Sequence, residues 1–410
     1  MTLLIKNASV VNVANPLEPV RGSDMAKLPV VEDAYVLIDN QTIAGVGPMS
    51  DWNGKAFPDQ VVDATGCFVM PAWCDSHTHL VFSGSREREF VDKINGLTYA
   101  EIAARGGGIL YSAKLVEDIT EDQLFEQSWK RLQEVRSSGT GSIEIKSGYG
   151  LSVEQELKML RVIKRIRERT NMLVRSTFLG AHAIPVAYRE NKEAYIDSII
   201  RDMLPVIKAE KLADYVDVFC ENGFYSVADM ERVCTAGLAA GLQMKVHVNQ
   251  LNSIGGLQKA IEMGARSVDH LEVMNEQDIR DLAASHTIGT ILPTAAFFLR
   301  MPYQPARAMI EAGAALALAT DYNPGSSPSG NMNLAVSLSC IQLKMKPEEA
   351  IQAATINGAF AMDAAAETGS IWPGKRADLI LTKPIPSLYY YPYAFGSNLI
   401  DRVMIGGDFI

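Results

Sequence analysis

The chain has 410 residues and a formal charge of −10, because 48 acidic residues outnumber 38 basic ones while the histidines are neutral. Its hydrophobic content of 48% excludes a disordered chain, and its scattered glycine and proline exclude a collagen-like repeat. The acidic balance, without a cluster of Lys or Arg, argues against nucleic acid or an anionic membrane as a partner.

Residues 1 to about 65 predict short strands. Segments 3–13 and 34–47 alternate β-branched and polar residues, and Asp39-Asn40 supplies hairpin turn chemistry within the second segment. Lys6 interrupts the first apolar stretch, so the N-terminus does not have the pattern of a signal peptide.

Between residues 66 and 321 the pattern becomes strand and helix in alternation. Most candidate strands are apolar throughout, which is typical of parallel strands buried on both faces. Eight of them favour a (β/α)8 TIM-like barrel, and an open doubly wound sheet is the alternative. Helix ends are marked by a capping-box pattern at Ser152, by Ser226 and by a C-terminal Gly241. The eight candidate strands are 67–77, 141–147, 173–182, 215–221, 243–249, 267–272, 287–293 and 315–321.

After the barrel, a helix is predicted around 347–362, followed by strands in 369–383 and near 402–407. The Pro- and Tyr-rich stretch 383–398 is interpreted as an ordered surface or interface segment. The longest apolar run, 312–319, is too short to span a bilayer. An odd number of cysteines without C-x-x-C spacing favours free thiols, a reducing compartment and hence a cytoplasmic protein. These cysteines are Cys67, Cys74, Cys220, Cys234 and Cys340.

Five of the six histidines fall at the C-terminal end of a predicted strand, which is the catalytic face of a barrel. His77 and His79 are two residues apart, so on a strand their imidazoles point to one side. His247 ends another strand, and Asp321 follows a small apolar one, where a carboxylate is costly unless it is paired or metal-bound. Three histidines and one aspartate suit Zn²⁺ or iron better than Mg²⁺ or Ca²⁺.

Each of these histidines also has an ordinary structural interpretation. His286 precedes its strand, so we expect a surface or packing residue there. His182 and His270 could each be a hydrogen-bonded core histidine. Their joint placement at strand ends favours a shared site instead.

The segments PAWCDSHTHL and GSIWPGKRADLIL resemble the first-strand metal motif and the C-terminal return segment of the amidohydrolase superfamily. The resemblance implies that the terminal segments form a small β-sandwich domain beside the barrel. It therefore implies three parts: 1–65 in the β-sandwich, 66–365 as the barrel, and 366–410 completing the β-sandwich.

Within that superfamily, several further segments are similar to the imidazolonepropionase family. They are SREREF, AARGGGI, IKSGYGL, FLGAHAIP, KVHVNQLNSIGG and TDYNPGSSP, and the resemblance runs from residue 3 to residue 410. It implies a homodimer and metal-assisted hydrolysis of a ring C–N bond in 4-imidazolone-5-propanoate, giving N-formimino-L-glutamate.

The resemblance also implies a role for individual residues. His270 would lie beside the attacking water, and Asp321 would carry its proton to the departing ring nitrogen. Arg86 offers the forked donor that a propionate carboxylate accepts best. The implied metal ligands are His77, His79, His247 and Asp321. The implied substrate contacts are Arg86, Tyr149, His182, Gln250, Asn323, Gly325 and Ser326.

Gln250 departs from family members that carry Glu at this place, three residues after the strand-five histidine. An amide cannot act as a general base, so Gln250 is interpreted as an orienting residue, and proton transfer is left to Asp321 and His270. The end of strand four reads Cys220-Glu221 without a bridging Lys, which favours one Zn²⁺ or Fe²⁺/Fe³⁺ per subunit.

Two other functions remain open from the residues. A deaminase of the same superfamily would share the metal ligands but would not need the Arg86 carboxylate clamp. A catalytically inactive scaffold is the second alternative, although such proteins typically lose the ligands that are present here. Zinc and iron cannot be told apart from a His₃Asp set.

Overall fold

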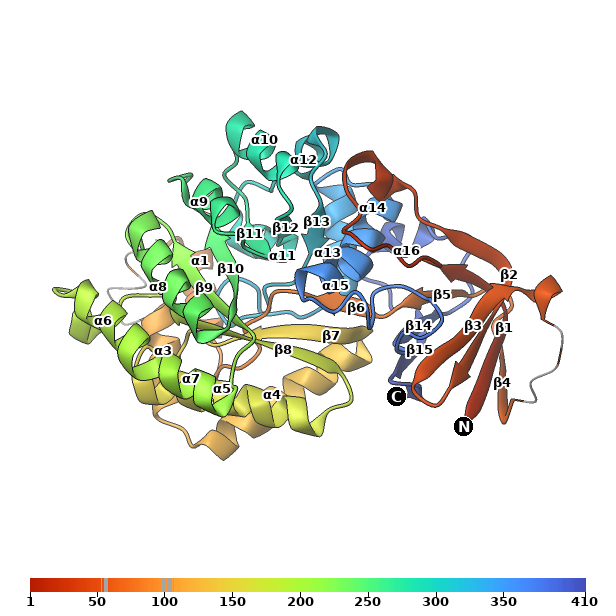
Figure 1. Cartoon of the computed structure of the whole chain (residues 1–410), viewed down its shortest axis with the longest axis horizontal. Coiled ribbons are helices and arrows are strands. Elements are labelled where there is room, and N and C mark those ends of the chain that lie inside the picture. Colours follow the sequence, from red (N-terminus) through yellow and green to blue (C-terminus); the bar gives the residue numbers. More distant parts are fainter. Residues whose placement is uncertain (53, 55–57, 98–100, 102–104, 106) are drawn as a thin grey trace.

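Two sheets organise the molecule, a computed structural model. One is an eight-stranded parallel sheet wrapped by helices, and the other is a mixed sheet built from both ends of the chain (Figure 1). This arrangement confirms the predicted fold class, an α/β (β/α)8 barrel with a small β domain formed by the terminal segments. The residues described are 1–52, 54, 58–97, 101, 105 and 107–410.

The barrel strands follow one another in chain order, and each pairs in parallel with the next. Their residues are almost all buried, because helices cover the outside while side chains fill the interior. The strands are β6 (Trp73–Asp75), β7 (Thr140–Lys146), β8 (Leu173–Ala181), β9 (Tyr215–Cys220), β10 (Gln243–Val248), β11 (Ser267–His270), β12 (Ile288–Ile291) and β13 (Leu316–Leu318).

One strand prediction needs correction. Segment 67–77, taken as a single strand, contains β5 (Phe68–Pro71) in the mixed sheet and β6 in the barrel. The chain passes from one sheet to the other between them, where Ala72 donates its N–H to the Asp378 carbonyl (2.9 Å). An apolar run buried throughout does not reveal that it changes sheets.

Helices alternate with the strands and carry the expected end signals. Ser152 accepts the Gln155 N–H at the start of α5, and Ser226 forms a capping box at the start of α8. Gly241 ends α8 in the left-handed conformation (φ 94°), as predicted. Among the described residues, no helix is both long enough and apolar enough to cross a membrane.

The barrel helices before β13 are α1 (Glu87–Ile94), α3 (Ile109–Glu117), α4 (Glu121–Ser137), α5 (Val153–Arg169), α6 (Lys192–Ser198), α7 (Leu204–Glu210), α8 (Val227–Ala240), α9 (Gly256–Glu262), α10 (Glu276–Ala284), α11 (Pro293–Leu299) and α12 (Ala306–Ala312). Those after it are α13 (Met332–Ile341), α14 (Pro347–Gln352), α15 (Gly358–Ala361) and α16 (Tyr390–Tyr393). Short 3-10 or π turns lie at Gly22–Ala26, Met49–Asp51, Val186–Tyr188, Ile199–Met203 and Ala353–Asn357.

The barrel closes between its first and last strands. The Asp75 carboxylate accepts the backbone N–H (3.0 Å) and the hydroxyl (2.7 Å) of Thr320. One residue further on, Asp321 donates its N–H to the His77 carbonyl at 3.0 Å. This seam places the His-x-His segment directly beside Asp321.

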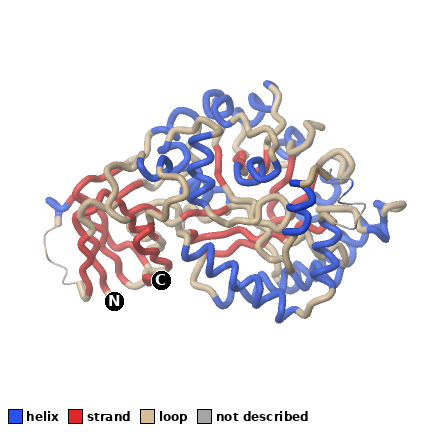
Figure 2. The backbone as a smooth tube through the Cα atoms, turned by 180° about the vertical axis from the view of Figure 1, so that it is seen from behind, coloured by secondary structure: helices blue, strands red, loops and turns tan. Residues whose placement is uncertain are grey.

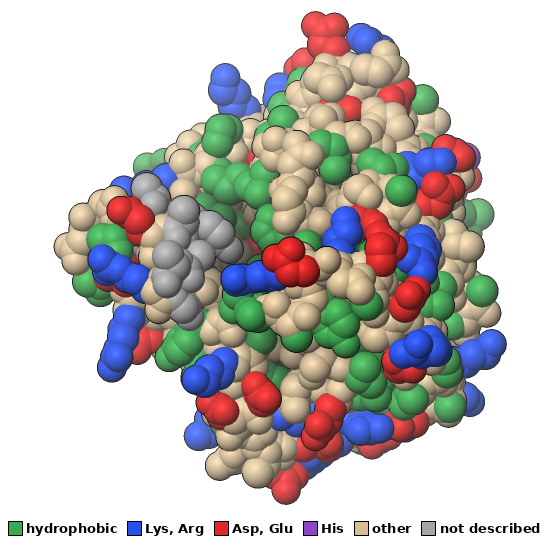
Figure 3. Space-filling view, turned by 90° about the vertical axis from the view of Figure 1, so that its left-hand side faces the viewer, with side chains coloured by type: hydrophobic (Ala, Val, Ile, Leu, Met, Phe, Trp, Pro, Cys, Tyr) green, Lys and Arg blue, Asp and Glu red, His purple; other side chains and the backbone are tan. Residues whose placement is uncertain are grey.

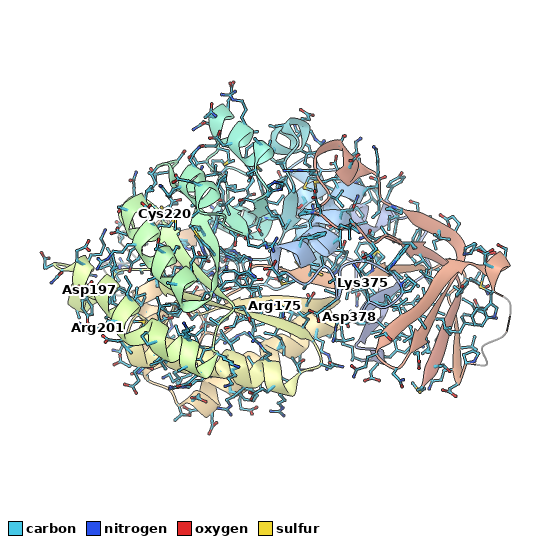
Figure 4. The ribbon with its side chains drawn as sticks, viewed as in Figure 1. Arg175, Asp197, Arg201, Cys220, Lys375 and Asp378 are labelled. Carbon is cyan, nitrogen blue, oxygen red and sulfur yellow. The ribbon has the colours of Figure 1, made fainter. Side chains whose placement is uncertain are left out.

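The mixed sheet has its own apolar core and holds both termini (Figure 2). Asn40, at φ 52°, makes the predicted hairpin turn between β2 and β3. Lys375 and Asp378, labelled in Figure 4, lie where this sheet meets the barrel. Lys375 Nζ donates to the Ala365 carbonyl at 2.6 Å. The strands are β1 (Thr2–Val11), β2 (Val30–Asp39), β3 (Thr42–Pro48), β4 (Gln60–Asp63), β5, β14 (Leu379–Thr382), β15 (Ile400–Ile405) and β16 (Asp408–Phe409).

Candidate metal centre and active site

The histidines at the strand ends converge. His77, His79 and His247 offer ligand atoms that lie within 4.8 Å of one another, and His77, His270 and Asp321 form a second such group. Asp321 Oδ1 lies 3.5 Å from His77 Nε2 and 3.6 Å from His79 Nε2. The predicted ligands therefore meet in one place. The sixth histidine, His286, is exposed and lies before β12, as expected.

The ring nitrogens of this cluster fit a metal ion. His77 Nε2, His79 Nδ1 and His247 Nε2 are buried and have no hydrogen-bond partner among the described residues. Buried polar atoms without partners are costly, so this set indicates an ion or water between them. Burial lowers the pKa of each imidazole well below its ordinary value, which keeps the rings in the neutral form that binds metals. Nitrogen-rich donors suit a divalent transition metal.

Asp321 is held by the loop that follows β13. Its backbone is in the left-handed region (φ 54°), and Ser326 Oγ donates to its Oδ2 at 3.0 Å. Asn323 Nδ2 donates to the Asp321 carbonyl at 2.6 Å and to Ser326 Oγ at 2.6 Å. Burial raises the pKa of Asp321 to about 6. Asn323 and Ser326, both predicted to contact substrate, thus lie at the site, and their polar groups hold Asp321 and its loop.

Tyr149 and His182 form an aromatic wall beside His79. The rings of His79 and His182 stack with centroids 5.2 Å apart and planes 16° apart. Tyr149 lies 5.4 Å from His182, centroid to centroid. His182 Nδ1 lies 2.9 Å from the Gly148 carbonyl, which can only accept, so Nδ1 carries the proton. Its Nε2 is then an acceptor in the neutral ring.

His270 lies against the cluster at the end of β11, with a left-handed backbone (φ 90°). Glu272 Oε1 is 3.5 Å from His270 Nδ1 and accepts Gln304 Nε2 at 2.9 Å. Burial alone would lower the pKa of His270, but the carboxylates of Glu272 and Asp321 raise it above its ordinary value. Glu272 was not predicted, although it lies only two residues after His270 and within the same candidate strand.

Arg86 is buried and already paired. Its Nε and Nη2 donate to Glu89 Oε2 at 2.9 and 2.7 Å, and Glu89 Oε1 accepts the Gly108 N–H at 2.9 Å. The guanidinium also packs on Gly325, where a Cβ would overlap it. Glu89 therefore occupies the Nε–Nη2 edge of Arg86, and Gly325 lies against Nη1. An apolar cavity of about 410 Å³ borders this arginine, lined by Phe82, Phe90, Phe298 and Tyr322 among others.

Gln250 belongs to the turn that follows β10. Its backbone N–H donates to Glu221 Oε1 at 2.6 Å, and the same carboxylate accepts the N–H groups of Leu251 (3.1 Å) and Asn252 (3.0 Å). Glu221, after the last residue of β9, therefore fixes the conformation of this turn. Cys220 of that strand is labelled in Figure 4.

Beneath the histidines, the barrel interior contains a charged layer that was not predicted. Lys146 Nζ lies 2.6 Å from Glu144 Oε1 and 2.9 Å from Asp217 Oδ2, and Lys245 pairs with Glu144. Burial would lower the pKa of Lys146, but Asp217 and Glu144 raise it above its ordinary value. The sequence did hold a signal, because the charged residues Glu144 and Lys146 alternate within one apolar strand and Lys245 lies within another. The charged layer is Glu144, Lys146, Asp217, Lys245 and Asp269.

The outer surface carries mixed charges, whereas the histidines of the cluster are confined to the interior. On the face shown in Figure 3, basic and acidic side chains lie next to one another, and no histidine side chain is visible. The histidines of the cluster have relative exposures of 0 to 3%, and His182 has 8%. The chemistry described above therefore lies inside the barrel mouth.

Residues 68–410 match the model of the amidohydrolase family. A curated protein named imidazolonepropionase from Flavobacterium johnsoniae is 56% identical over 394 residues, which is 96% of each chain. Another of that name, from Christiangramia forsetii, is 54% identical over 413 aligned positions and the whole of both chains.

Solved structures share the fold at low identity. An adenosine deaminase from Xanthomonas campestris with bound zinc has a TM-score of 0.73 at 18% identity, covering 99% of this chain and 92% of that one. A guanine deaminase from C. acetobutylicum has a TM-score of 0.71 at 14% identity, with both chains covered completely.

Proposed function

The chain belongs to the amidohydrolase family and, within it, to the imidazolonepropionases, and from this premise we propose how its residues carry the reaction. It is a hydrolase of carbon–nitrogen bonds in cyclic amides that acts in histidine degradation. The reaction opens the ring of 4-imidazolone-5-propanoate to N-formimino-L-glutamate. The full-length similarity to relatives of that name, together with the buried histidine cluster, carries this conclusion.

We infer that His77, His79, His247 and Asp321 hold one metal ion, either Zn²⁺ or Fe²⁺/Fe³⁺, in each subunit. The support is the cluster of ligand atoms and its unpartnered ring nitrogens. When bound, such an ion lowers the pKa of a water molecule from about 16 towards about 7 and makes hydroxide available at neutral pH.

The substrate is oriented at both of its ends. Arg86 binds the propionate carboxylate, and Tyr149 with His182 hold the ring next to His79, where the aromatic wall lies. Gln250 orients the ring or the attacking water through its amide. The loop residues Asn323, Gly325 and Ser326 complete the pocket, since Gly325 adjoins Arg86 and the other two adjoin Asp321.

Proton transfer uses two groups. Asp321 accepts the proton of the attacking water and passes it to the departing ring nitrogen, a role that suits a buried carboxylate held at the cluster by Ser326. His270 donates to the oxyanion that develops on the ring carbonyl, and the nearby carboxylate of Glu272 favours its protonated form. Gln250 takes no part in proton transfer, because an amide does not titrate.

The experiment measures turnover of 4-imidazolone-5-propanoate by metal-replete protein, with His247→Ala at equal concentration as the control for spontaneous decay. We expect formiminoglutamate from the wild type, and loss of both metal and turnover in the variant. Ammonia release from cyclic amidines without ring opening of the imidazolone would support the deaminase alternative. A His247→Ala protein with full metal content and activity would overturn the ligand assignment.

We also propose a cytoplasmic homodimer that binds no nucleic acid, and we retain the division at 1–65, 66–365 and 366–410. Five free thiols support a reducing compartment. Tyr389, Tyr393 and Phe395 expose 59, 77 and 66% of their surface near α16, which favours burial against a second copy. Light scattering during size-exclusion chromatography tests the dimer: twice the chain mass of 44.7 kDa supports it, and the monomer mass contradicts it.

A further inference from the structure

Asp269 reaches one of the proposed metal ligands from the far side of the barrel interior. It lies on β11, while His77 follows β6, and these strands are not neighbours in the sheet. Asp269 Oδ2 is 2.7 Å from His77 Nδ1, and both side chains are completely buried. This contact is a hydrogen bond across the barrel and not part of a strand ladder.

The bond determines the chemical form of His77. An ionised carboxylate can only accept, so Nδ1 of His77 must carry the proton, and Nε2 is left with its lone pair. That Nε2 is buried, has no hydrogen-bond partner among the described residues, and lies 3.5 Å from Asp321 Oδ1. A lone pair is therefore directed into the cluster by a hydrogen bond on the opposite side of the ring.

Both carboxylate oxygens of Asp269 already have partners, so Asp269 is not itself a metal ligand. Its Oδ1 accepts the Ser267 hydroxyl at 2.6 Å, and its Oδ2 lies 3.6 Å from Lys146 Nζ in addition to the His77 contact. Lys146 also lies 2.6 Å from Glu144 and 2.9 Å from Asp217, so a single ammonium group contacts three buried carboxylates. Each oxygen of Asp269 is thus satisfied within the barrel.

Asp217 provides a similar support for a second ligand. Its Oδ1 accepts the backbone N–H of His247 at 3.1 Å, and its Oδ2 lies 2.9 Å from His247 Nδ1. Through Lys146, the supports of His77 and His247 belong to one network. A charged layer in a barrel interior is expensive to bury, and apolar side chains would fill the same space. Orientation of the ligands explains why charges occupy it.

We propose that Asp269 is a positioning residue for the metal site, because it fixes the orientation and tautomer of His77. Lys146 supplies the positive charge beside Asp269. Asp217 supports His247 in the same way. The inference rests on the proposed metal site and names residues that do not touch metal or substrate. Partners of this kind typically change metal affinity or activity by about 10–100-fold when they are removed.

The test measures metal affinity by competition with a chromophoric chelator in Asp269→Ala and in the isosteric Asp269→Asn. The Ala variant loses the acceptor, and we expect binding weaker by about 10–100-fold. The Asn variant keeps an oxygen that can accept the Nδ1–H, so we expect a smaller loss. The Co²⁺-loaded variants should also show altered visible absorption bands, since the coordination geometry changes.

Asp378→Asn is the matched control, because Asp378 is a buried carboxylate at the junction of the two sheets, where it accepts from Arg376 and Gly406 (Figure 4). It should lower the melting temperature without changing metal affinity. Wild-type affinity in a folded Asp269→Asn or Asp269→Ala protein, or an equal loss in Asp378→Asn, would overturn the inference. If Asp269→Ala does not fold, Asp269→Asn decides alone. A wild type that binds metal but does not open imidazolones would refute the proposed reaction and leave this inference standing.

Discussion

Arg86 and Gly325 fit against each other: the guanidinium of Arg86 occupies the space in which a Cβ at position 325 would lie. Glu89 holds the Nε and Nη2 edge of the same guanidinium at 2.9 and 2.7 Å. The arginine proposed to bind the substrate carboxylate is therefore fixed from two sides, by a carboxylate on the helix that it precedes and by a glycine in the loop after β13. Both contacts define where a substrate carboxylate can be placed.

Gly325→Ala should displace Arg86 and weaken substrate binding. A displaced guanidinium loses charge-assisted hydrogen bonds of about 1.5–3 kcal/mol, so we expect KM to rise by about 10–100-fold. Gly47→Ala is the control, because a Cβ there would only make an ordinary contact with Tyr35 at 3.5 Å. Steady-state kinetics of both variants test this prediction. An unchanged KM in Gly325→Ala would contradict the proposed contact between Gly325 and the substrate-binding Arg86.

Arg86→Ala should raise KM by a similar factor, about 10–100-fold, while kcat changes less, because the carboxylate lies away from the bond that breaks. Arg86→Lys should not restore the affinity, since an ammonium cannot offer the planar fork. The neighbouring Arg88 is exposed on the same helix, so Arg88→Ala serves as the control. Loss of kcat alone in Arg86→Ala would move this residue from substrate binding to the chemical step.

Thr320→Val should destabilise the seam of the barrel. It removes the hydroxyl that donates to Asp75 at 2.7 Å and leaves a buried carboxylate oxygen short of a partner, at a cost of about 1–3 kcal/mol. Thr290→Val makes the same change on β12, where the buried hydroxyl has no partner among the described residues. Denaturant unfolding should show a lower free energy of unfolding for Thr320→Val and little change in it for Thr290→Val. Equal losses would show that the Asp75 bond is not responsible.

Thiol reactivity should separate the five cysteines into two groups. Cys74, Cys220 and Cys234 are buried, whereas Cys67 and Cys340 are partly exposed. Burial raises the pKa of Cys74, Cys220 and also the partly exposed Cys340 to about 12, so almost no thiolate is present on these three at pH 8, and Cys67 should react fastest. A colorimetric thiol reagent at pH 8 should react with at most two groups in the native protein and with all five in denaturant. Fast reaction of more than two native thiols would contradict the burial described here.

The sequence was sufficient to predict the barrel, because buried parallel strands are apolar runs that alternate with capped helices. It also identified His77, His79, His247 and Asp321, since polar residues at strand ends stand out against apolar strands. The structure brings these four together, and their roles as ligands remain a prediction.

Other features depended on contacts between strands that are distant in the chain. Segment 67–77 is divided between two sheets, and the sequence pattern of an apolar run does not show where the chain changes sheets. Glu89 and Glu272 are a different case: they lie three and two residues after Arg86 and His270, but the sequence does not show that their carboxylates turn towards those side chains. The charged layer was detectable in principle, because Glu144 and Lys146 share one face of an otherwise apolar strand, but which charge pairs with which is a property of the closed barrel.

The most direct test of the central claim is the position of solvent oxygen in the product. The reaction is run in H₂¹⁸O with metal-replete protein, and the product is fragmented in a mass spectrometer. Attack on the ring carbonyl predicts one ¹⁸O atom in the newly formed carboxylate of formiminoglutamate and none in the formimino group, at a rate well above that with His247→Ala. Label at the formimino carbon, or a rate equal to that of the variant, would contradict the account.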